Sequence, residues 1–163
     1  MASVEFQWLF ATEYPAVLRT VWLVLRDRAR AEDIAQDAFE QLLLHWEKVR
    51  NYDSPETWVR RVALRRAAQW VRREHRLTPR LRLAAQPEIA GEPELPDPGL
   101  LAAVRDLPMR QRAAVVLFYF EDRPMTEIAQ ILDCSPATGW VHLHRAGRRL
   151  AEQLGEEMVS DVT

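Results

Sequence analysis

The spacing of apolar residues constrains the fold of this 163-residue chain most, because it is helical almost throughout. Apolar side chains recur at intervals of three and four residues, and no segment alternates for long enough to predict a strand. The pattern predicts helices over residues 4–26, 31–49, 55–76, 100–106, 109–120, 126–132 and 136–154. We therefore expect an all-α protein.

Proline marks three of the expected helix starts. Ser54-Pro55 and Ser135-Pro136 each offer a hydroxyl at the N-cap and a proline at the first helical position, where its missing N–H is not needed. Leu107-Pro108 opens a further helix.

The one strong break is the segment 84–99, which holds four prolines, two glycines and four acidic residues but no basic residue. Such a composition is typical of a linker. With 48% hydrophobic residues the chain can bury one ordinary core or two small ones, and the break favours two. We expect domains over residues 1–83 and 100–154, joined by this linker and followed by a frayed acidic tail over 155–163.

Several function classes are disfavoured by the composition. A single cysteine, Cys134, excludes an internal disulfide, and the four histidines show no metal-binding spacing, so no metal or cofactor is expected. No apolar run approaches the roughly 20 residues of a membrane span, and the N-terminus lacks the basic region of a signal peptide. We expect a soluble cytoplasmic protein without membrane insertion. No paired carboxylates, phosphate-binding loop or nucleophile constellation stands out, so we do not expect an enzyme.

Basic charge is concentrated in one segment. Seven arginines lie between Trp58 and Arg76, although the whole chain has a net charge of −2. Residues 50–83 hold ten basic and three acidic residues, whereas acidic residues exceed basic ones in every other part of the chain. Because clustered cations repel one another, such a cluster indicates a surface for a polyanion, and nucleic acid is the polyanion we expect.

The arginine helix has two faces at about 100° per residue. Val59, Ala63, Ala67 and Trp70 form an apolar side, with Arg61, Arg65, Arg72 and Arg76 almost opposite. Trp58 projects with the arginines. It is therefore either a partly exposed aromatic at the helix start or a platform on which an unpaired base stacks, while the arginines follow phosphates.

The helix that starts near residue 31 also has two faces. Its apolar side contains Ala31, Ala35, Ala38, Phe39, Leu42 and Trp46, and its polar side contains Asp33, Gln36, Asp37, Glu40 and Glu47. An acidic stripe of this kind is either a solvated face or a docking surface for a basic partner.

The C-terminal part has the pattern of a helix-turn-helix. Residues 126–132 form a short first helix in which the small Ala129 permits a close helix crossing. Asp133 to Ser135 form the turn, and Pro136 opens the second helix.

Together these segments resemble the extracytoplasmic-function sigma factors, the small two-domain initiation factors of bacterial RNA polymerase. Residues 30–39, RAEDIAQDAF, are similar to region 2.2 of that family, and Thr57-Trp58 with the arginine helix are similar to regions 2.3 and 2.4. Residues 107–132 and His144-Arg145-Ala146 resemble region 4. The resemblance extends from about Tyr14 to Leu154, with a linker in the matching place.

The resemblance implies roles for these faces. Asp33, Gln36, Asp37 and Glu40 would contact the β′ clamp helices of core RNA polymerase, whose β flap would contact region 4. Trp58, Arg61, Arg65, Arg72 and Arg76 would bind promoter DNA at the minus-10 element and hold its non-template strand. Thr138, Trp140, His142, Arg145, Arg148 and Arg149 would contact the minus-35 element. An anti-sigma factor is a further partner that the resemblance implies.

The sequence departs from the family in the second helix of the helix-turn-helix. Gly139 stands where a packing valine is usual, and Trp140 and His142 stand where basic residues usually face DNA. The glycine is expected to leave an unfilled spot against the first helix. Trp140 either fills that spot or has a functional role. Arg65 stands where the family often has asparagine, so the preferred base is not predicted.

Three functions from different classes fit these features. The leading hypothesis is a sigma factor that directs transcription initiation. The second is a sigma-derived regulator that keeps a polymerase or partner contact but has lost ordinary minus-35 recognition. The third is a dimeric helix-turn-helix repressor, which leaves Trp58 and the arginine face unexplained.

Overall fold

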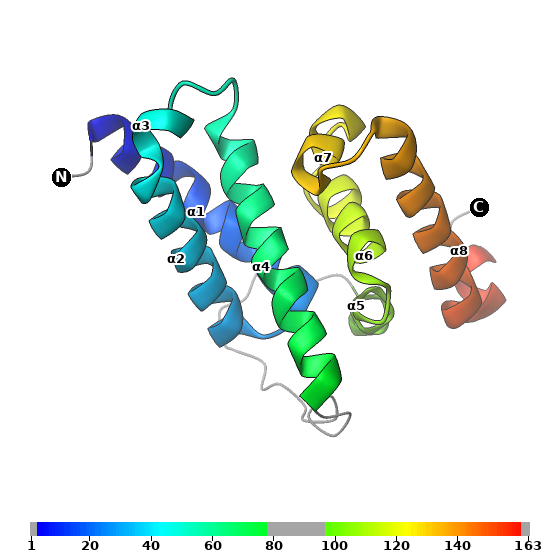
Figure 1. Ribbon diagram of the computed structural model, residues 1–163. Helices are drawn as coiled ribbons and strands as arrows, with labels where there is room; N and C mark the ends of the chain where they lie inside the picture. The colour runs from blue at the N-terminus through cyan, green and yellow to red at the C-terminus, as the bar shows by residue number, and fades with distance from the viewer. Residues whose placement is uncertain (1–2, 78–96, 161–163) are drawn as a thin grey trace.

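The computed structural model describes residues 3–77 and 97–160, apart from the side chains of residues 75–77, 98 and 156–160. Over these residues the chain is helical and contains no strand. An N-terminal group and a C-terminal group of helices lie side by side (Figure 1). The predicted all-α fold with two small helical units is confirmed.

The helix bounds lie close to those predicted. The N-terminal group comprises α1 (Val4–Leu25), α2 (Arg28–Leu44), α3 (Trp46–Val49) and α4 (Pro55–Leu77). The C-terminal group comprises α5 (Pro98–Arg105), α6 (Met109–Val115), the π-helical segment η2 (Val116–Phe120), α7 (Met125–Leu132) and α8 (Pro136–Ser160).

Two predicted helices are divided in the structure. The helix expected over 31–49 begins earlier, because the Asp27 carboxylate caps it by accepting a hydrogen bond from the Arg30 N–H at 3.0 Å, and it is interrupted at His45. The helix expected over 109–120 changes to π-helical bonding, in which the Glu121 N–H donates to the Val116 carbonyl at 3.1 Å. In α8 the predicted end at residue 154 coincides with a break at Gly155, whose φ is 71°.

The N-terminal unit packs α1, α2 and α4 around one apolar core. The buried faces are those that the sequence predicts: Phe39 and Leu42 on α2 and Val59 and Ala63 on α4 are all at most 1% exposed. Val21 of α1 joins the same core. The N-cap predicted for α4 is also present, since the Ser54 hydroxyl accepts a hydrogen bond from the Thr57 N–H at 3.2 Å.

A buried ion pair fixes α4 against α1. Arg60 of α4 is 2% exposed and donates a hydrogen bond to the Glu13 carboxylate of α1 at 2.6 Å. A buried cation needs such a partner, because its desolvation costs several kcal/mol. Removal of the partner from a buried ion pair destabilises a protein by about 3–5 kcal/mol. The pair therefore joins α4 to α1 beside the apolar face that α4 buries in the core.

The predicted helix-turn-helix is confirmed in the C-terminal unit. Asp133 ends α7 in the left-handed conformation with φ of 57°, and the Cys134 N–H donates to the Ala129 carbonyl at 2.9 Å. The Ser135 hydroxyl caps α8 by accepting from the Thr138 N–H at 3.1 Å. Leu143 of α8 is buried in the same core as Ile128 of α7.

The predicted linker extends too far at its C-terminal end. The Asp97 carboxylate accepts a hydrogen bond from the Gly99 N–H at 2.9 Å and caps α5, so the helix begins at Pro98 rather than at residue 100. Proline suits this first helical position. Residues 84–96 of the predicted linker and residues 161–163 of the predicted tail lie outside the described residues.

Arg112 of α6 makes one of the contacts between the two units. Its side chain is 6% exposed and donates to the Leu107 carbonyl of its own unit and to the Val24 carbonyl of α1, each at 3.0 Å.

Among the helices of the described ranges, none has both the length and the apolar character to cross a membrane.

The prediction of an unfilled spot beside Gly139 is wrong. An added Cβ at Gly139 would overlap the Met125 sulfur of α7, so the methionine already occupies the space that a valine would take. Gly139 lets α8 approach this long side chain closely. Trp140 is not the filler either, because it is 50% exposed.

We predict different outcomes for alanine substitutions of two glycines in α8. Gly147→Ala stabilises the protein by about 0.5–1 kcal/mol, since alanine favours a helix over glycine and nothing lies within 4 Å of the added Cβ. Gly139→Ala loses this gain, because Met125 must move. Urea denaturation measures both free energies of unfolding. In a Met125→Ala background, Gly139→Ala should become as favourable as Gly147→Ala, and equal effects of the two alanines in the native background would contradict the overlap.

Candidate nucleic-acid interface

The arginines of α4 divide among three environments. Arg60 is buried against Glu13, and Arg66 is half-buried and pairs with Asp37 of α2. Arg61 and Arg65 reach across to the C-terminal unit, whereas Arg72 and Arg73 are exposed. Arg76 belongs to the last turn of α4, where side chains are not described. The predicted basic face is therefore present, but only some of its arginines are without a contact to the C-terminal unit.

Arg60 has a structural role that the arginine cluster alone does not predict, because it is buried and paired with Glu13. At about 100° per residue it falls between Ala67 and Val71 on the apolar side of α4. This position on the apolar side of α4 predicts that the side chain of Arg60 is buried.

Trp58 lies in the first turn of α4, held in place by the Ser54 cap. Its side chain is half-buried against the core, and its ring centre is 5.9 Å from the His45 ring at an interplanar angle of 45°. The partly exposed aromatic expected at the helix start is present. A half-exposed indole whose back is supported by protein is also the form that a base-stacking platform takes.

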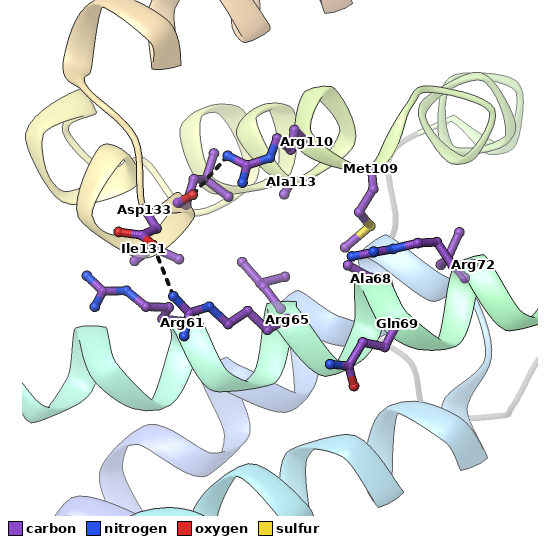
Figure 2. Close-up of a pocket in the computed structure, with 13 residues that line it drawn as sticks. Arg61, Arg65, Ala68, Gln69, Arg72, Met109, Arg110, Ala113, Ile131 and Asp133 are labelled. Atoms are coloured by element: carbon purple, nitrogen blue, oxygen red, sulfur yellow. Dashed lines mark hydrogen bonds and ion pairs between the residues drawn. The ribbon is translucent and has the colours of Figure 1, made fainter.

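Figure 2 shows how Arg61 and Arg65 point from α4 toward the end of α7. Arg61 donates from Nε and Nη2 to the Gln130 carbonyl, at 2.9 and 2.5 Å. Arg65 donates from Nη2 to the Asp133 carboxylate at 3.1 Å. These contacts join the predicted minus-10 face to the helix-turn-helix, which the sequence does not predict.

A cavity of about 430 Å³ lies between α4 and the two helices α6 and α7 (Figure 2). Apolar side chains, including Leu64 and Ile131, form part of its lining. Its charged lining consists of the arginines Arg61, Arg65, Arg72 and Arg110 and the single carboxylate of Asp133. The cavity is therefore strongly electropositive.

The acidic face of α2 is largely free. Asp33, Gln36 and Glu40 are exposed, as predicted, while Asp37 is half-buried by its ion pair with Arg66. Leu44, near the end of the same helix, is 75% exposed and adds an apolar element that the charge pattern did not reveal. An acidic face beside an exposed leucine suits a protein partner better than a nucleic acid.

The predicted minus-35 residues do not all share one side of α8. Thr138, His142, Arg145 and Arg149 form a row at about 100° per residue, with Arg148 at its edge. Trp140 lies roughly opposite this row, where its ring packs edge-on against Phe118 with centres 5.5 Å apart. Trp140 therefore does not join the group to which it was assigned.

His142 adds little positive charge to the row. Its pKa is lowered by partial burial, and further by the neighbouring cations Arg110 and Arg145. Since an imidazole with an ordinary pKa near 6.5 is already largely neutral at pH 7, this lowering leaves it neutral. The exposed Arg145, Arg148 and Arg149 supply the positive charge on this part of α8.

Both units match known family models. Residues 9–77, a segment that includes α4 and the acidic face of α2, match sigma-70 region 2. Residues 99–150, a segment that includes the helix-turn-helix, match sigma-70 region 4.

Curated relatives and a solved structure match most of the chain. The chain is 30% identical over 153 residues to the RNA polymerase sigma-E factor of Streptomyces coelicolor, covering 93% of this chain and 86% of that protein. It is 27% identical over 147 residues to the RNA polymerase sigma factor SigV of Bacillus subtilis, covering 87% and 86%. The sigma factor RpoE of Bartonella quintana, solved in complex with the anti-sigma factor NepR, has the same fold, with a TM-score of 0.74, 19% identity and coverage of 93% and 98%.

Two sigma regions in the family's order, over nearly the whole chain, show that the protein belongs to the extracytoplasmic-function sigma factors, the alternative sigma factors that direct transcription initiation by RNA polymerase.

Proposed function

We propose that α4 binds the non-template strand of the minus-10 element, with Trp58 stacking on a base and Arg61, Arg65, Arg72 and Arg76 binding phosphates. The half-exposed Trp58 at the start of α4, on the side of the arginine row, is the observation that carries this proposal. Unstacking a base costs a few kcal/mol, which one stacking contact of about 1–3 kcal/mol and several phosphate contacts offset. This mechanism requires positioning and no covalent chemistry, so we expect no enzymatic activity.

The acidic face of α2 is proposed to bind core RNA polymerase through its β′ clamp helices. Asp33, Gln36 and Glu40 are exposed and available for this contact, and Asp37 joins them at the edge of the face. The exposed Leu44 supports the same assignment, because protein interfaces combine charged rims with apolar anchors. An anti-sigma factor is a further proposed partner, as NepR is for the Bartonella quintana RpoE.

For α8 we propose a reduced minus-35 contact, made by Thr138, His142, Arg145 and Arg149 with Arg148 at the edge. Trp140 is left out of this contact because it faces the other side of the helix. With His142 neutral, the row offers one cation fewer than a second helix with a basic residue at position 142. This observation also favours the second function, a sigma-derived regulator that has lost ordinary minus-35 recognition.

Trp58→Ala should reduce promoter opening by about 5- to 150-fold, because the stacking of one base is lost. Permanganate reactivity of the minus-10 thymines in reconstituted holoenzyme measures this loss, on a promoter found by mapping start sites on genomic DNA. Trp58→Phe, which keeps an aromatic face, serves as the matched control and should retain most of the activity. Equal opening by wild type and Trp58→Ala would contradict the stacking role.

Charge reversal on α2 should separate polymerase binding from DNA binding. The double variant Asp33→Lys, Glu40→Lys should bind core polymerase at least about tenfold more weakly, because like charges at an interface cost several kcal/mol. Glu47→Lys on α3 is the control, since this residue is also exposed but is not assigned to the contact. Co-elution with core polymerase is the measurement, and unchanged co-elution of the double variant would rule out this face as the docking surface.

Two substitutions on α8 should differ in their effect on duplex DNA. His142→Arg adds a cation to the row and should steepen the dependence of log K on log salt by about 0.9, the value for one phosphate contact. Trp140→Lys adds the same charge on the other side and should change the slope little. Fluorescence anisotropy with promoter duplex measures both slopes. A large change for Trp140→Lys alone would show that the DNA-facing side of α8 has been misassigned.

A further inference from the structure

We propose that the cavity between α4 and the helices α6 and α7 is a small-molecule site that binds a nucleoside diphosphate. The inference goes beyond the proposed contacts with promoter DNA, since it concerns a separate ligand. It is carried by the charge, the hydrogen-bond donors and the apolar surface that line this one concave space.

The size and the walls of the cavity suit a small molecule. Its volume of about 430 Å³ lies within the range of about 300–1,000 Å³ that is usual for ligand pockets. Helix α4 forms one wall, and α6 and α7 form the other (Figure 2). A ligand in this space is therefore contacted from two sides.

The charge of the lining matches that of two phosphates. Among the residues that the structure describes, the lining contains four arginines and the single carboxylate of Asp133, which gives a net charge of +3. Three of these arginines belong to α4, and Arg110 belongs to α6, so both walls contribute positive charge. A nucleoside diphosphate, with a charge of about −3 near neutral pH, balances this lining.

The guanidinium groups keep N–H donors for a ligand. Arg110 donates from Nη1 to the Leu132 carbonyl at 3.0 Å, and Arg61 donates from Nε and Nη2 to the Gln130 carbonyl at 2.9 and 2.5 Å. A guanidinium has five N–H donors, so these contacts hold the two side chains in place and leave other donors available. The side chain of Arg72 is exposed and forms no ion pair within the described part of the chain.

The apolar part of the lining suits a nucleobase. Leu64 and Val71 contribute apolar surface from α4, and Met109 and Ile131 contribute it from the opposite wall. A planar base buries its faces against such side chains, and the methionine sulfur makes favourable contacts with aromatic rings. The base should therefore add affinity that a diphosphate without a nucleoside lacks.

Isothermal titration calorimetry of the full-length protein tests whether the site exists. The ligands are ADP, GDP, CDP, UDP and inorganic pyrophosphate, in a buffer of physiological ionic strength. At least one nucleoside diphosphate should bind with a Kd of about 100 μM or tighter, and at least about tenfold more tightly than pyrophosphate. Failure of all four nucleotides to bind, or equal affinity for pyrophosphate, would overturn the proposal.

A charge substitution with a matched control locates the site. Arg110→Gln should weaken nucleotide binding by about five- to tenfold, because a charged hydrogen-bond donor is removed from the lining. Arg73→Gln removes the same charge from an exposed arginine of α4 that does not line the cavity, and should change the affinity by less than about twofold. Equal losses in the two variants would mean that the nucleotide responds to overall charge, which contradicts a site in the cavity.

A neutral substitution tests the cavity without any change of charge. Ala68→Leu places a larger side chain in the lining at a half-buried position of α4, and should weaken nucleotide binding at least about fivefold. Ala102→Leu makes the same change at an exposed position of α5 and should have no effect. Circular dichroism checks that both variants keep the helical content of the wild type. A folded Ala68→Leu protein with wild-type affinity would exclude the cavity as the site.

Binding of DNA separates this inference from the proposed function. Arg110 is not part of the proposed minus-10 face, so Arg110→Gln should bind a fluorescein-labelled single strand of the mapped minus-10 element as the wild type does. If Arg110→Gln weakens strand binding and no nucleotide binds, the cavity belongs to the DNA contact and the nucleotide site is wrong. If nucleotides bind as expected but no variant binds the strand, only the minus-10 role of α4 falls.

Discussion

The ion pair between Arg60 and Glu13 is the interaction on which the geometry of the N-terminal unit depends. It places one cation of a basic helix inside the protein, where it fixes α4 against α1. In the same arrangement Val59 and Ala63 lie in the core, and Arg61 lies on the side of α4 that faces away from it. A helix whose surface carries many like charges repels itself, and this pair supplies a local attraction that offsets part of that repulsion.

Local features of the fold were predictable because they depend on neighbouring residues. The caps at Ser54 and Ser135, the apolar face of α2 and the turn at Asp133 each follow from a few adjacent side chains. The inward position of Arg60 also follows from the helical period, which places it between Ala67 and Val71.

Other features were not predictable because they depend on residues far apart in the chain. The contact of Arg61 with Gln130 joins residues separated by 69 positions and arises only from the way the two units meet. The fit of Gly139 depends on the conformation of the Met125 side chain, which no pattern of residue types specifies. The position of Trp140 opposite the arginine row follows from the helical period, yet comparison with the family's sequence pattern alone suggested a shared face.

The ion pair between Asp37 and Arg66 has a thermodynamic consequence for the two proposed surfaces of the N-terminal unit. Its carboxylate belongs to the acidic face of α2, and its guanidinium belongs to α4. If a partner engages Asp37, it weakens the hold on Arg66, and by linkage a strand that engages Arg66 changes the affinity for that partner by the same factor. The pair is partly exposed, so this coupling is limited to about 1 kcal/mol, or roughly a fivefold change in affinity. Such a coupling would act through one ion pair between α2 and α4.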